Sequence, residues 1–327
     1  MNIPPLKFRP ILKSAIWGGE KIAPLKGIVT DQTQIGESWE ISGVPGNESV
    51  VDGGQEDGKS LPALIKEYGA SLVGEENFRR FGTTFPLLVK IIDAAGDLSV
   101  QVHPDDELAA KRHNSLGKTE MWYIMDTDPD ANIYAGLSQS ITPDDYITLV
   151  NEKKIMDVVA RHKSHPGDVF FLPAGRIHAI GAGNLLCEIQ ETSDITYRVY
   201  DFDRRDAKTG LPRELHVDLA KDAIDYTVYP SYVTKAGEMH DGVAELVKCP
   251  HFDVRLITVN GTKTLDLSAT PSFMTLTCTD GNCTITDDRG NTIELRRGQS
   301  ALVPAMASSI TLEGNATLVS GVNQTQP

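Results

Sequence analysis

The sequence predicts a mainly β protein made of two jelly-roll-like β-barrel domains, with a small helical insertion in its N-terminal part. The segment 167–178 has the pattern of a strand, a Pro-x-Gly turn and a histidine directly after the turn. The segment 298–305 repeats the first eight positions of that pattern. Residues 252–319 form short alternating runs separated by Gly-containing pairs, which is typical of a barrel or sandwich with little helix.

The repeated segment divides the chain into two domains. In the second copy, Ser309 stands at the position of His178, and Met306 stands at the position of Gly175. We therefore expect a metal-binding barrel with helical insertions over residues 1–236. Residues 237–327 are expected to form a degenerate barrel that kept the fold and lost the metal ligands.

The N-terminal domain is predicted to begin with short strands and loops. Ser60, as N-cap, and Pro62 in the first turn then start a helix that ends at Gly69. Two strands follow, over residues 85–93 and 98–103.

Three more helices are expected further along the chain. The first begins with the acidic turn at 105–107, and the second begins at Thr142 and runs on in pieces towards His162. The third covers residues 216–226. In the second domain, the turns are expected at Asn260–Gly261, Asp280–Gly281 and Arg289–Gly290.

Charge and composition exclude several classes of partner. The formal net charge is −14, and binding to nucleic acid or to an anionic membrane depends on a basic surface. No apolar run approaches the roughly 18 residues of a membrane span, and we expect no signal peptide at the N-terminus. Cys278 and Cys283 flank a predicted turn and could pair, but without a secretory signal we expect free thiols and a cytoplasmic protein.

Three separate segments offer ligands for a divalent metal. Alternation along strand 98–103 places Gln101 and His103 on one face, which we expect to line the barrel interior. Glu120 lies on another predicted strand, and His178 follows the Pro-x-Gly turn. Two imidazoles, a carboxylate and an amide oxygen suit Zn²⁺, and the same set accepts Mn²⁺, Fe²⁺ or Co²⁺.

A histidine beside a strand is more often a structural residue than a metal ligand. Here His178 completes a longer spacing motif and His103 lies on a polar inward face, so we favour the metal site. Gln101 is the weakest member, because an amide oxygen binds metals poorly and could instead donate a hydrogen bond to a ligand.

Several long segments resemble the type I mannose-6-phosphate isomerases, specifically their short bacterial branch within the cupin superfamily. The spacing Gly-x5-Pro-x-Gly-x2-His in 167–178 is similar to the second metal motif of cupins. The strongest matches are Leu87–Ile91, Leu98–Pro104, Gly117–Tyr123 and Cys187–Arg198. The resemblance implies zinc ligands at Gln101, His103, Glu120 and His178. It also implies the interconversion of mannose 6-phosphate and fructose 6-phosphate through a cis-enediol, catalysed by domain 1–236.

Three residues are candidates for the catalytic groups of such a reaction. Glu188 and Lys118 are the candidate acid and base, because Glu188 is placed in the pocket by the resemblance and Lys118 lies two residues before Glu120. Arg198 matches the active-site arginine of the family. The alternative to a catalytic role for Arg198 is a structural salt bridge to Glu188 or Glu191.

A strongly acidic protein that binds a phosphate dianion needs a locally basic pocket. We expect Lys90, Ser99 and Arg204 to contact the phosphate. A neighbouring carboxylate would equally explain Lys90, since a buried lysine needs a partner. Trp17 and Trp39 could form a sugar-facing wall or belong to the core.

Two other functions remain as alternatives to the isomerase. One is another metal-dependent cupin enzyme, such as an oxygenase or epimerase, and the other is a non-catalytic sugar-binding cupin. In the preferred reading the partner is a sugar phosphate, and the chain is a monomer or a weak homodimer.

Overall fold

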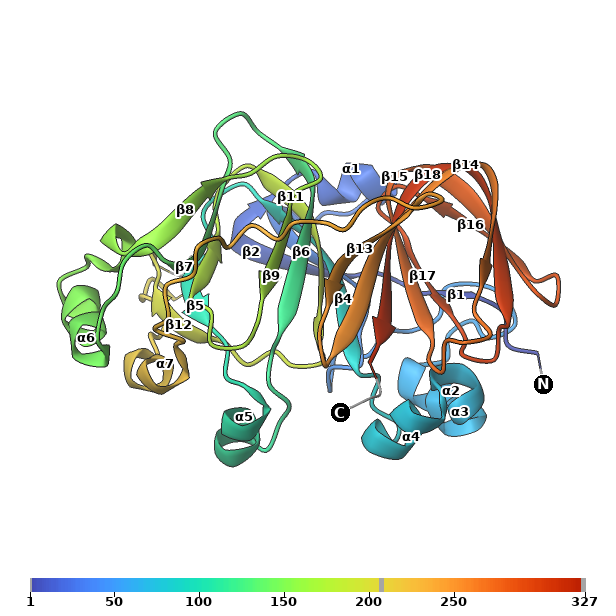
Figure 1. Ribbon diagram of the computed structural model, residues 1–327, viewed down its shortest axis with the longest axis horizontal. Helices are drawn as coiled ribbons and strands as arrows, with labels where there is room; N and C mark the ends of the chain where they lie inside the picture. Colours follow the sequence, from blue (N-terminus) through green and yellow to red (C-terminus); the bar gives the residue numbers. More distant parts are fainter. Residues whose placement is uncertain (1, 206–208, 325–327) are drawn as a thin grey trace.

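The computed structural model describes residues 2–205 and 209–324, and it confirms a mainly β fold with two barrels (Figure 1). The strands of these residues form three sheets. Two of the sheets enclose the N-terminal barrel, and the third curls on itself to make the C-terminal barrel. None of the helices in the described ranges is long and apolar enough to span a membrane.

The first sheet of the N-terminal barrel has six strands. In spatial order they are β2 (Ile11–Gly19), β3 (Ile35–Ile41), β4 (Leu87–Ala94), β11 (Asn184–Glu191), β6 (Glu120–Thr127) and β9 (Val169–Leu172). The second sheet has five strands. They are β12 (Tyr197–Tyr200), β5 (Val100–Val102), β10 (His178–Ile180), β7 (Asn132–Leu137) and β8 (Val159–Lys163).

The C-terminal barrel is one sheet that includes a strand from the start of the chain. Its order is β1 (Leu6–Lys7), β17 (Ser300–Val303), β15 (Met274–Asp287), β18 (Ser309–Asn323), β14 (Phe252–Asp266) and β13 (Val243–Lys248), with β16 (Thr292–Arg296) beside β15. Leu6 pairs with Leu302. The domain boundary at 236/237 stays a prediction, and β1 crosses it by hydrogen bonding to β17.

The central strands of the six-stranded sheet, β4, β11 and most of β6, are buried on both faces. Along β6, Trp122 and Ile124 point into the N-terminal barrel, whereas Met121 and Tyr123 pack in the core between the barrels. Successive side chains of a strand point to opposite faces. The sheet is therefore a wall that the two barrels share.

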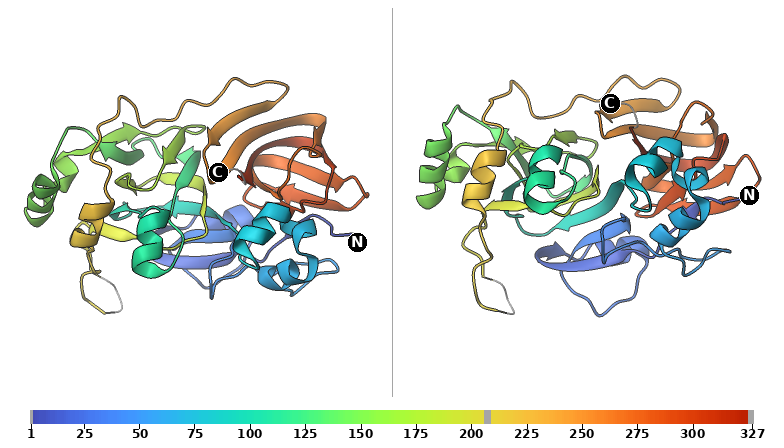
Figure 2. Two further views of the ribbon diagram at one scale, coloured as in Figure 1. Left: turned by 60° about the horizontal axis from the view of Figure 1, so that its bottom comes forward. Right: turned by 90° about the horizontal axis from the view of Figure 1, so that it is seen from below.

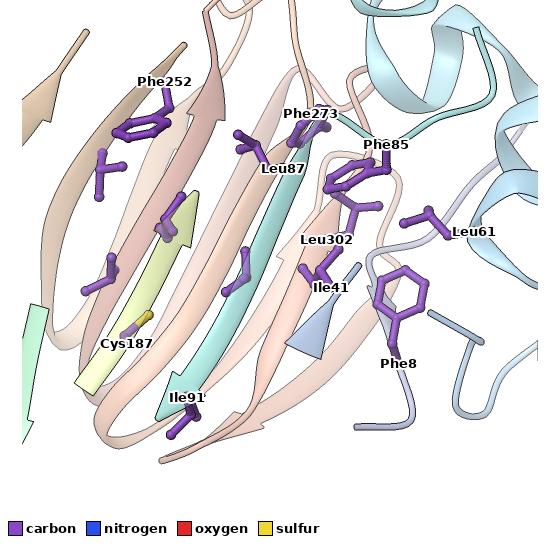
Figure 3. Close-up of a cluster of buried hydrophobic side chains, with 14 of the residues drawn as sticks. Phe8, Ile41, Leu61, Phe85, Leu87, Ile91, Cys187, Phe252, Phe273 and Leu302 are labelled. Atoms are coloured by element: carbon purple, nitrogen blue, oxygen red, sulfur yellow. The ribbon is translucent and has the colours of Figure 1, made fainter. Parts of the chain in front are cut away.

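The core between the barrels is drawn in Figure 3. Phe85 and Cys187 come from the N-terminal part, and Phe252, Phe273 and Leu302 come from the C-terminal barrel. The rings of Phe85 and Phe273 lie with their centroids 4.3 Å apart. One continuous apolar cluster thus holds the second barrel against the first.

The predicted turns at Asn260–Gly261 and Asp280–Gly281 are wrong. β14 and β15 continue through both pairs as long, bent strands. Gly261 has φ +89°, Gly281 has φ +69°, and Gly314 of the neighbouring β18 has φ +146°. These glycines lie close together across three paired strands, where the absence of Cβ lets the sheet bend sharply enough to close a barrel.

The bend also places the cysteines. Cys278 and Cys283 lie on the same strand, β15, and the predicted hairpin between them does not exist. All four cysteines are free thiols, as expected. The pair Arg289–Gly290 does form the predicted turn, between β15 and β16.

The expected helical insertion is present at one end of the C-terminal barrel. It consists of α2 (Leu61–Tyr68), α3 (Ala70–Val73) and α4 (Glu75–Phe81) (Figures 1 and 2). Ser60 caps α2 by accepting a hydrogen bond from the backbone N–H of Ala63, and Gly69 ends it with φ +51°. The short helix α1 (Ile22–Lys26) lies between β2 and β3.

The remaining helices lie around the N-terminal barrel. They are α5 (Asp106–His113), α6 (Pro143–Asn151), the 3₁₀ helix η1 (Ile155–Asp157) and α7 (Val217–Ala223). Thr142 and Asp145 form a capping box at the start of α6. The predicted helical run to His162 is wrong, because the chain after η1 forms strand β8 and His162 lies on it. The third predicted helix is shorter than 216–226.

The repeated sequence pattern corresponds to a repeated structure. β9 and β17 each lead into a turn closed by a backbone hydrogen bond to the carbonyl of a proline, Pro173 or Pro304. The next strand then begins at His178 in the first barrel and at Ser309 in the second. This turn places the His178 side chain in the wall of the N-terminal barrel.

Candidate active site and metal centre

Three side chains from separate strands meet inside the N-terminal barrel. His178 begins β10 and lies directly opposite Gln101 of β5. His103 follows β5, and Glu120 begins β6 in the facing sheet. One ligand atom from each of His103, Glu120 and His178 lies within 4.8 Å of the other two, and all three residues are buried.

Hydrogen bonds orient both imidazole rings for metal binding. Nδ1 of His103 is 2.8 Å from the carbonyl oxygen of Ile195, and Nδ1 of His178 is 2.8 Å from that of Arg176. A carbonyl can only accept, so each Nδ1 carries the proton and each Nε2 keeps a free lone pair. Burial holds the pKa of His103 well below its usual value and lowers that of His178 to about 3. Both rings are therefore neutral, as metal ligands must be.

Glu120 is the third member of this set. Its Oε1 is 3.2 Å from Nε2 of His178 and its Oε2 is 3.5 Å from Nε2 of His103. Lys118 Nζ approaches Oε2 to 2.7 Å, yet neither oxygen accepts a hydrogen bond of normal geometry from the described residues. Burial raises the pKa of Glu120 to about 7. A buried carboxylate facing two imidazole lone pairs is a set of donors that fits a divalent cation.

Gln101 lies beside the three candidate ligands. Its amide Nε2 is 3.3 Å from Nε2 of His178. Rotating the Gln101 side-chain amide by 180° exchanges its nitrogen and oxygen, and Oε1 would then face Nε2 of His178. Its role as a fourth ligand stays a prediction.

A cavity of about 330 Å³ lies beside the metal cluster: none of the three candidate ligands is in its lining, but Gln101, which contacts His178, and Lys118, which contacts Glu120, are. The cavity brings together five of the residues predicted to act on the substrate, namely Lys90, Ser99, Lys118, Glu188 and Arg198. Arg204 is not among the lining residues. Its guanidinium bonds to Asp201 and to the backbone of Asp97, and it lies over the ring of Phe202.

Lys90 and Glu188 form a buried ion pair across neighbouring strands. They lie directly opposite each other on β4 and β11, with Lys90 Nζ 2.9 Å from Oε1 of Glu188 and 3.7 Å from Glu37. The other oxygen of Glu188 accepts a hydrogen bond of 2.8 Å from the Trp122 indole. Burial opposes ionisation of Glu188, but Lys90 and Lys118 outweigh it and hold the pKa at about 2. Lys90 thus has the carboxylate partner that its burial requires.

Arg198 lies on β12, opposite Gln101 on β5. It forms neither of the alternative salt bridges to Glu188 or Glu191 within the described chain. Its Nη1 donates to the backbone oxygen of Glu214 at 2.9 Å, and its buried Nε has no partner among the residues described. Burial, together with the nearby Arg213, lowers the pKa of Arg198 from its usual value. The guanidinium therefore has one group engaged, Nη1, while its Nε still lacks a partner among the described residues and the side chain lines the cavity.

The two candidate wall tryptophans differ in position. Trp17 lines the cavity, whereas Trp39 lies outside the lining, with Lys90 Nζ 5.2 Å from the centre of its ring.

The cavity also contains residues that the sequence analysis did not assign to the site. They are Glu37, Asp194, Thr196 and Arg213, along with apolar residues of the wall. Asp194 and Thr196 lie within the segment 187–198 that carried the resemblance, so a closer comparison there could have found them. Arg213 lies in an irregular segment and has no periodic signal.

Comparisons with known proteins identify the family of this chain. Residues 6–143 match the family model "Phosphomannose isomerase type I, catalytic domain", and residues 243–323 match "Mannose-6-phosphate isomerase, cupin domain". The chain is 35% identical to "Mannose-6-phosphate isomerase ManA" of Bacillus subtilis, covering 98% of this chain and 99% of that protein. It is 32% identical to the "Mannose-6-phosphate isomerase" of Streptococcus mutans, covering 96% of this chain and 97% of the relative.

The similarity extends to a solved structure. The crystal structure of the mannose 6-phosphate isomerase from Bacillus subtilis superimposes with a TM-score of 0.88 at 32% identity, covering 98% of this chain and 99% of that one. The match spans both barrels, as do the sequence matches. The chain therefore belongs to the type I phosphomannose isomerase family.

Proposed function

We propose that this protein interconverts mannose 6-phosphate and fructose 6-phosphate in the cavity of its N-terminal barrel, with a divalent metal held by His103, Glu120 and His178. One observation carries the proposal. Two imidazole lone pairs and a buried carboxylate converge beside a cavity whose lining includes Lys118, Glu188 and Arg198, and Lys118 Nζ is 2.7 Å from the Glu120 carboxylate. The family membership supplies the substrate class.

The reaction moves one proton between neighbouring carbons. From the aldose, the proton on C2 leaves to a base, a cis-enediol forms, and a proton is added at C1 while the O2 hydroxyl proton is lost and O1 is protonated. A divalent cation, zinc in our proposal, would supply Lewis acidity to the two sugar oxygens. Arg198 lines the same cavity and offers N–H donors that would orient the sugar there.

Glu188 and Lys118 remain the candidates for proton transfer. Glu188 is ionised and can accept a proton, but its pKa of about 2 makes it a weak base near neutral pH. Lys118 lies 3.0 Å from Nε2 of His103, next to the metal cluster. Its Nζ is placed to give or take a proton beside the sugar oxygens. Solvent deuterium exchange at C1 of fructose 6-phosphate, in Glu188→Gln and in Lys118→Met, identifies the base as the residue whose loss stops exchange.

An isomerase assay tests the proposal directly. Purified protein is given fructose 6-phosphate with and without a chelator, and mannose 6-phosphate is measured. Conversion that the chelator stops and zinc restores is the expected result. No conversion by metal-replete protein refutes the activity, and His178→Ala protein that keeps both bound metal and activity refutes the site.

The cytoplasmic location and a monomeric or weakly dimeric state also belong to the proposal. They are supported by the four free thiols and the net charge of −14. Sedimentation across a concentration series and fractionation of the source cells test them.

A further inference from the structure

The cavity has a second pole, formed by arginines that the metal cluster does not use. Lys90 is engaged by Glu188, and Lys118 is engaged by Glu120. The cations that remain in the lining are Arg198 and Arg213.

Arg213 is held by a carboxylate that two guanidiniums share. Its Nε donates to Oδ2 of Asp201 at 2.8 Å, and its Nη2 donates to Oδ1 of the same residue. Nη2 of Arg204 also donates to Oδ1 of Asp201, at 2.6 Å. The Asp201 side chain is only 5% exposed, whereas that of Arg213 is 26% exposed. Asp201 thus fixes one edge of the Arg213 fork, and Nη1 donates no hydrogen bond within the described chain.

Backbone contacts keep the Arg213 segment against β12. The N–H of Arg198 donates to Nδ1 of His216 at 3.1 Å, and the N–H of His216 donates to the Arg198 carbonyl at 2.7 Å. The Arg198 side chain holds the Glu214 carbonyl. Arg198 and Arg213 therefore face the cavity from two segments that are tied together.

The charge at this pole suits an anion. Arg198, Arg204, Arg213 and Asp201 together carry a net +2, from three positive charges and one negative, in a protein whose net charge is −14. Of the charged groups nearby, Arg204 lies outside the cavity lining and the Asp194 side chain lies within it. The Ser99 hydroxyl lines the same cavity, is 95% buried by residue, and makes no hydrogen bond within the described ranges. Arginine forks match the oxygens of a phosphate dianion.

The separation of the two poles suits a sugar phosphate. Arg198 lies on β12, which is two strands from His178 on β10, with β5 between them. Two strand spacings are about 10 Å. The carbonyl end and the phosphate of a hexose 6-phosphate are likewise at opposite ends of the molecule.

We infer that Arg213, positioned by Asp201 and acting with Arg198 and Ser99, binds the phosphoryl group of the substrate, in the place that the sequence had suggested for Arg204. This inference rests on the proposed function, of which it names the anion subsite. Asp201 is a positioning residue, because it acts through Arg213. The contact binds substrate and transition state alike, so its loss raises KM and leaves kcat nearly unchanged.

Arg213→Ala tests the inference, with fructose 6-phosphate as substrate and inorganic phosphate as a competitive inhibitor. We expect KM and the phosphate inhibition constant to rise at least tenfold, with kcat within threefold of wild type. Asp201→Asn should raise KM in the same direction, and Arg213→Lys should recover part of the loss. Arg255→Ala is the matched control, because Arg255 makes the same two-bond clasp with Asp253 on β14, outside this cavity. It should leave both constants unchanged.

Two results overturn the inference. One is a rise of less than threefold in both constants for Arg213→Ala. The other is a larger rise for Arg204→Ala than for Arg213→Ala. Arg213→Gln, which keeps a donor for Asp201, serves as the second variant if Arg213→Ala does not fold. If wild type does not isomerise fructose 6-phosphate, the proposed function fails. The inference can still be tested in that case, because Trp17 lines the cavity and quenching of its fluorescence measures the binding of inorganic phosphate to wild type and to each variant.

Discussion

Replacing Lys90 with methionine should destabilise the protein strongly, because it leaves the Glu188 carboxylate buried without its main partner. The two side chains are 9% and 4% exposed, and their charged atoms are 2.9 Å apart. At an effective dielectric constant of about 20, this separation corresponds to about 6 kcal/mol of attraction. Removing lysine also removes its own desolvation cost, so the net loss should be about 3–5 kcal/mol, as for other broken buried pairs.

A double variant distinguishes loss of the pair from loss of packing. Lys90→Met/Glu188→Gln removes both charges and keeps an acceptor for the Trp122 indole. Its free energy of unfolding should return to within about 2 kcal/mol of wild type, while activity stays low because Glu188 is absent. Lys153→Met is the surface control: its pair with Asp203 has a similar length of 2.8 Å, but both side chains are 61% exposed, so stability should hardly change.

Urea unfolding, followed by circular dichroism and by tryptophan fluorescence, measures these differences, and coincident curves establish a two-state transition. The reasoning is refuted if Lys90→Met costs less than about 1 kcal/mol. It is also refuted if the double variant is no more stable than the single one.

Three further predictions concern pH, backbone geometry and metal. The His251 ring lies 2.9 Å from Glu191, and this contact raises the pKa of His251. The stabilisation from the pair is therefore complete below the ordinary pKa of histidine and is lost as the pH rises through the raised pKa. Urea midpoints should fall from pH 6 to pH 8 more in wild type than in His251→Gln, and equal falls would contradict this. Gly281→Ala should lower the free energy of unfolding by about 2 kcal/mol or more, because the added Cβ would lie 2.0 Å from a backbone oxygen. Gly290→Ala has open space around the added Cβ and should lower it less. Equal losses of stability in calorimetry would rule out the close approach as the cause. Zinc should raise the thermal midpoint of chelator-treated wild type but not of His178→Ala, and the same rise in both would exclude His178 as a ligand.

Much of the candidate metal site could be predicted from sequence because its determinants are local. The turn after Pro173 depends on Gly175, which has φ +87°, and the turn delivers His178 at the start of β10. Strand alternation likewise gave the shared face of Gln101 and His103. By the same alternation Leu98 would share the face of Val100. Leu98 instead precedes β5 and lines the cavity, whereas Val100 packs in a separate apolar cluster.

The features that sequence could not supply depend on distant parts of the chain. Asn260–Gly261 has the residues of a tight hairpin turn, but long-range pairing of β14 with β18 overrides that local preference and makes it a bend. Arg213 has no sequence pattern of its own; its hydrogen bonds to Asp201 and the contacts of its segment with β12 bring it to the cavity. For Lys90 the sequence leaves two partners open, a carboxylate and the phosphate, because a strand position does not show which residue lies opposite on the neighbouring strand.

The pairing of β1 with β17 also constrains the order in which the protein can fold during synthesis. Leu6 and Leu302 are partners, so the first strand leaves the ribosome about 300 residues before its neighbour exists. At typical elongation rates this interval is roughly 15 to 60 s. For that time the N-terminal segment has an unpaired edge, and the catalytic domain must form beside a sheet that is still being made. Strand β1 therefore reaches its final place only when the C-terminal barrel closes on it.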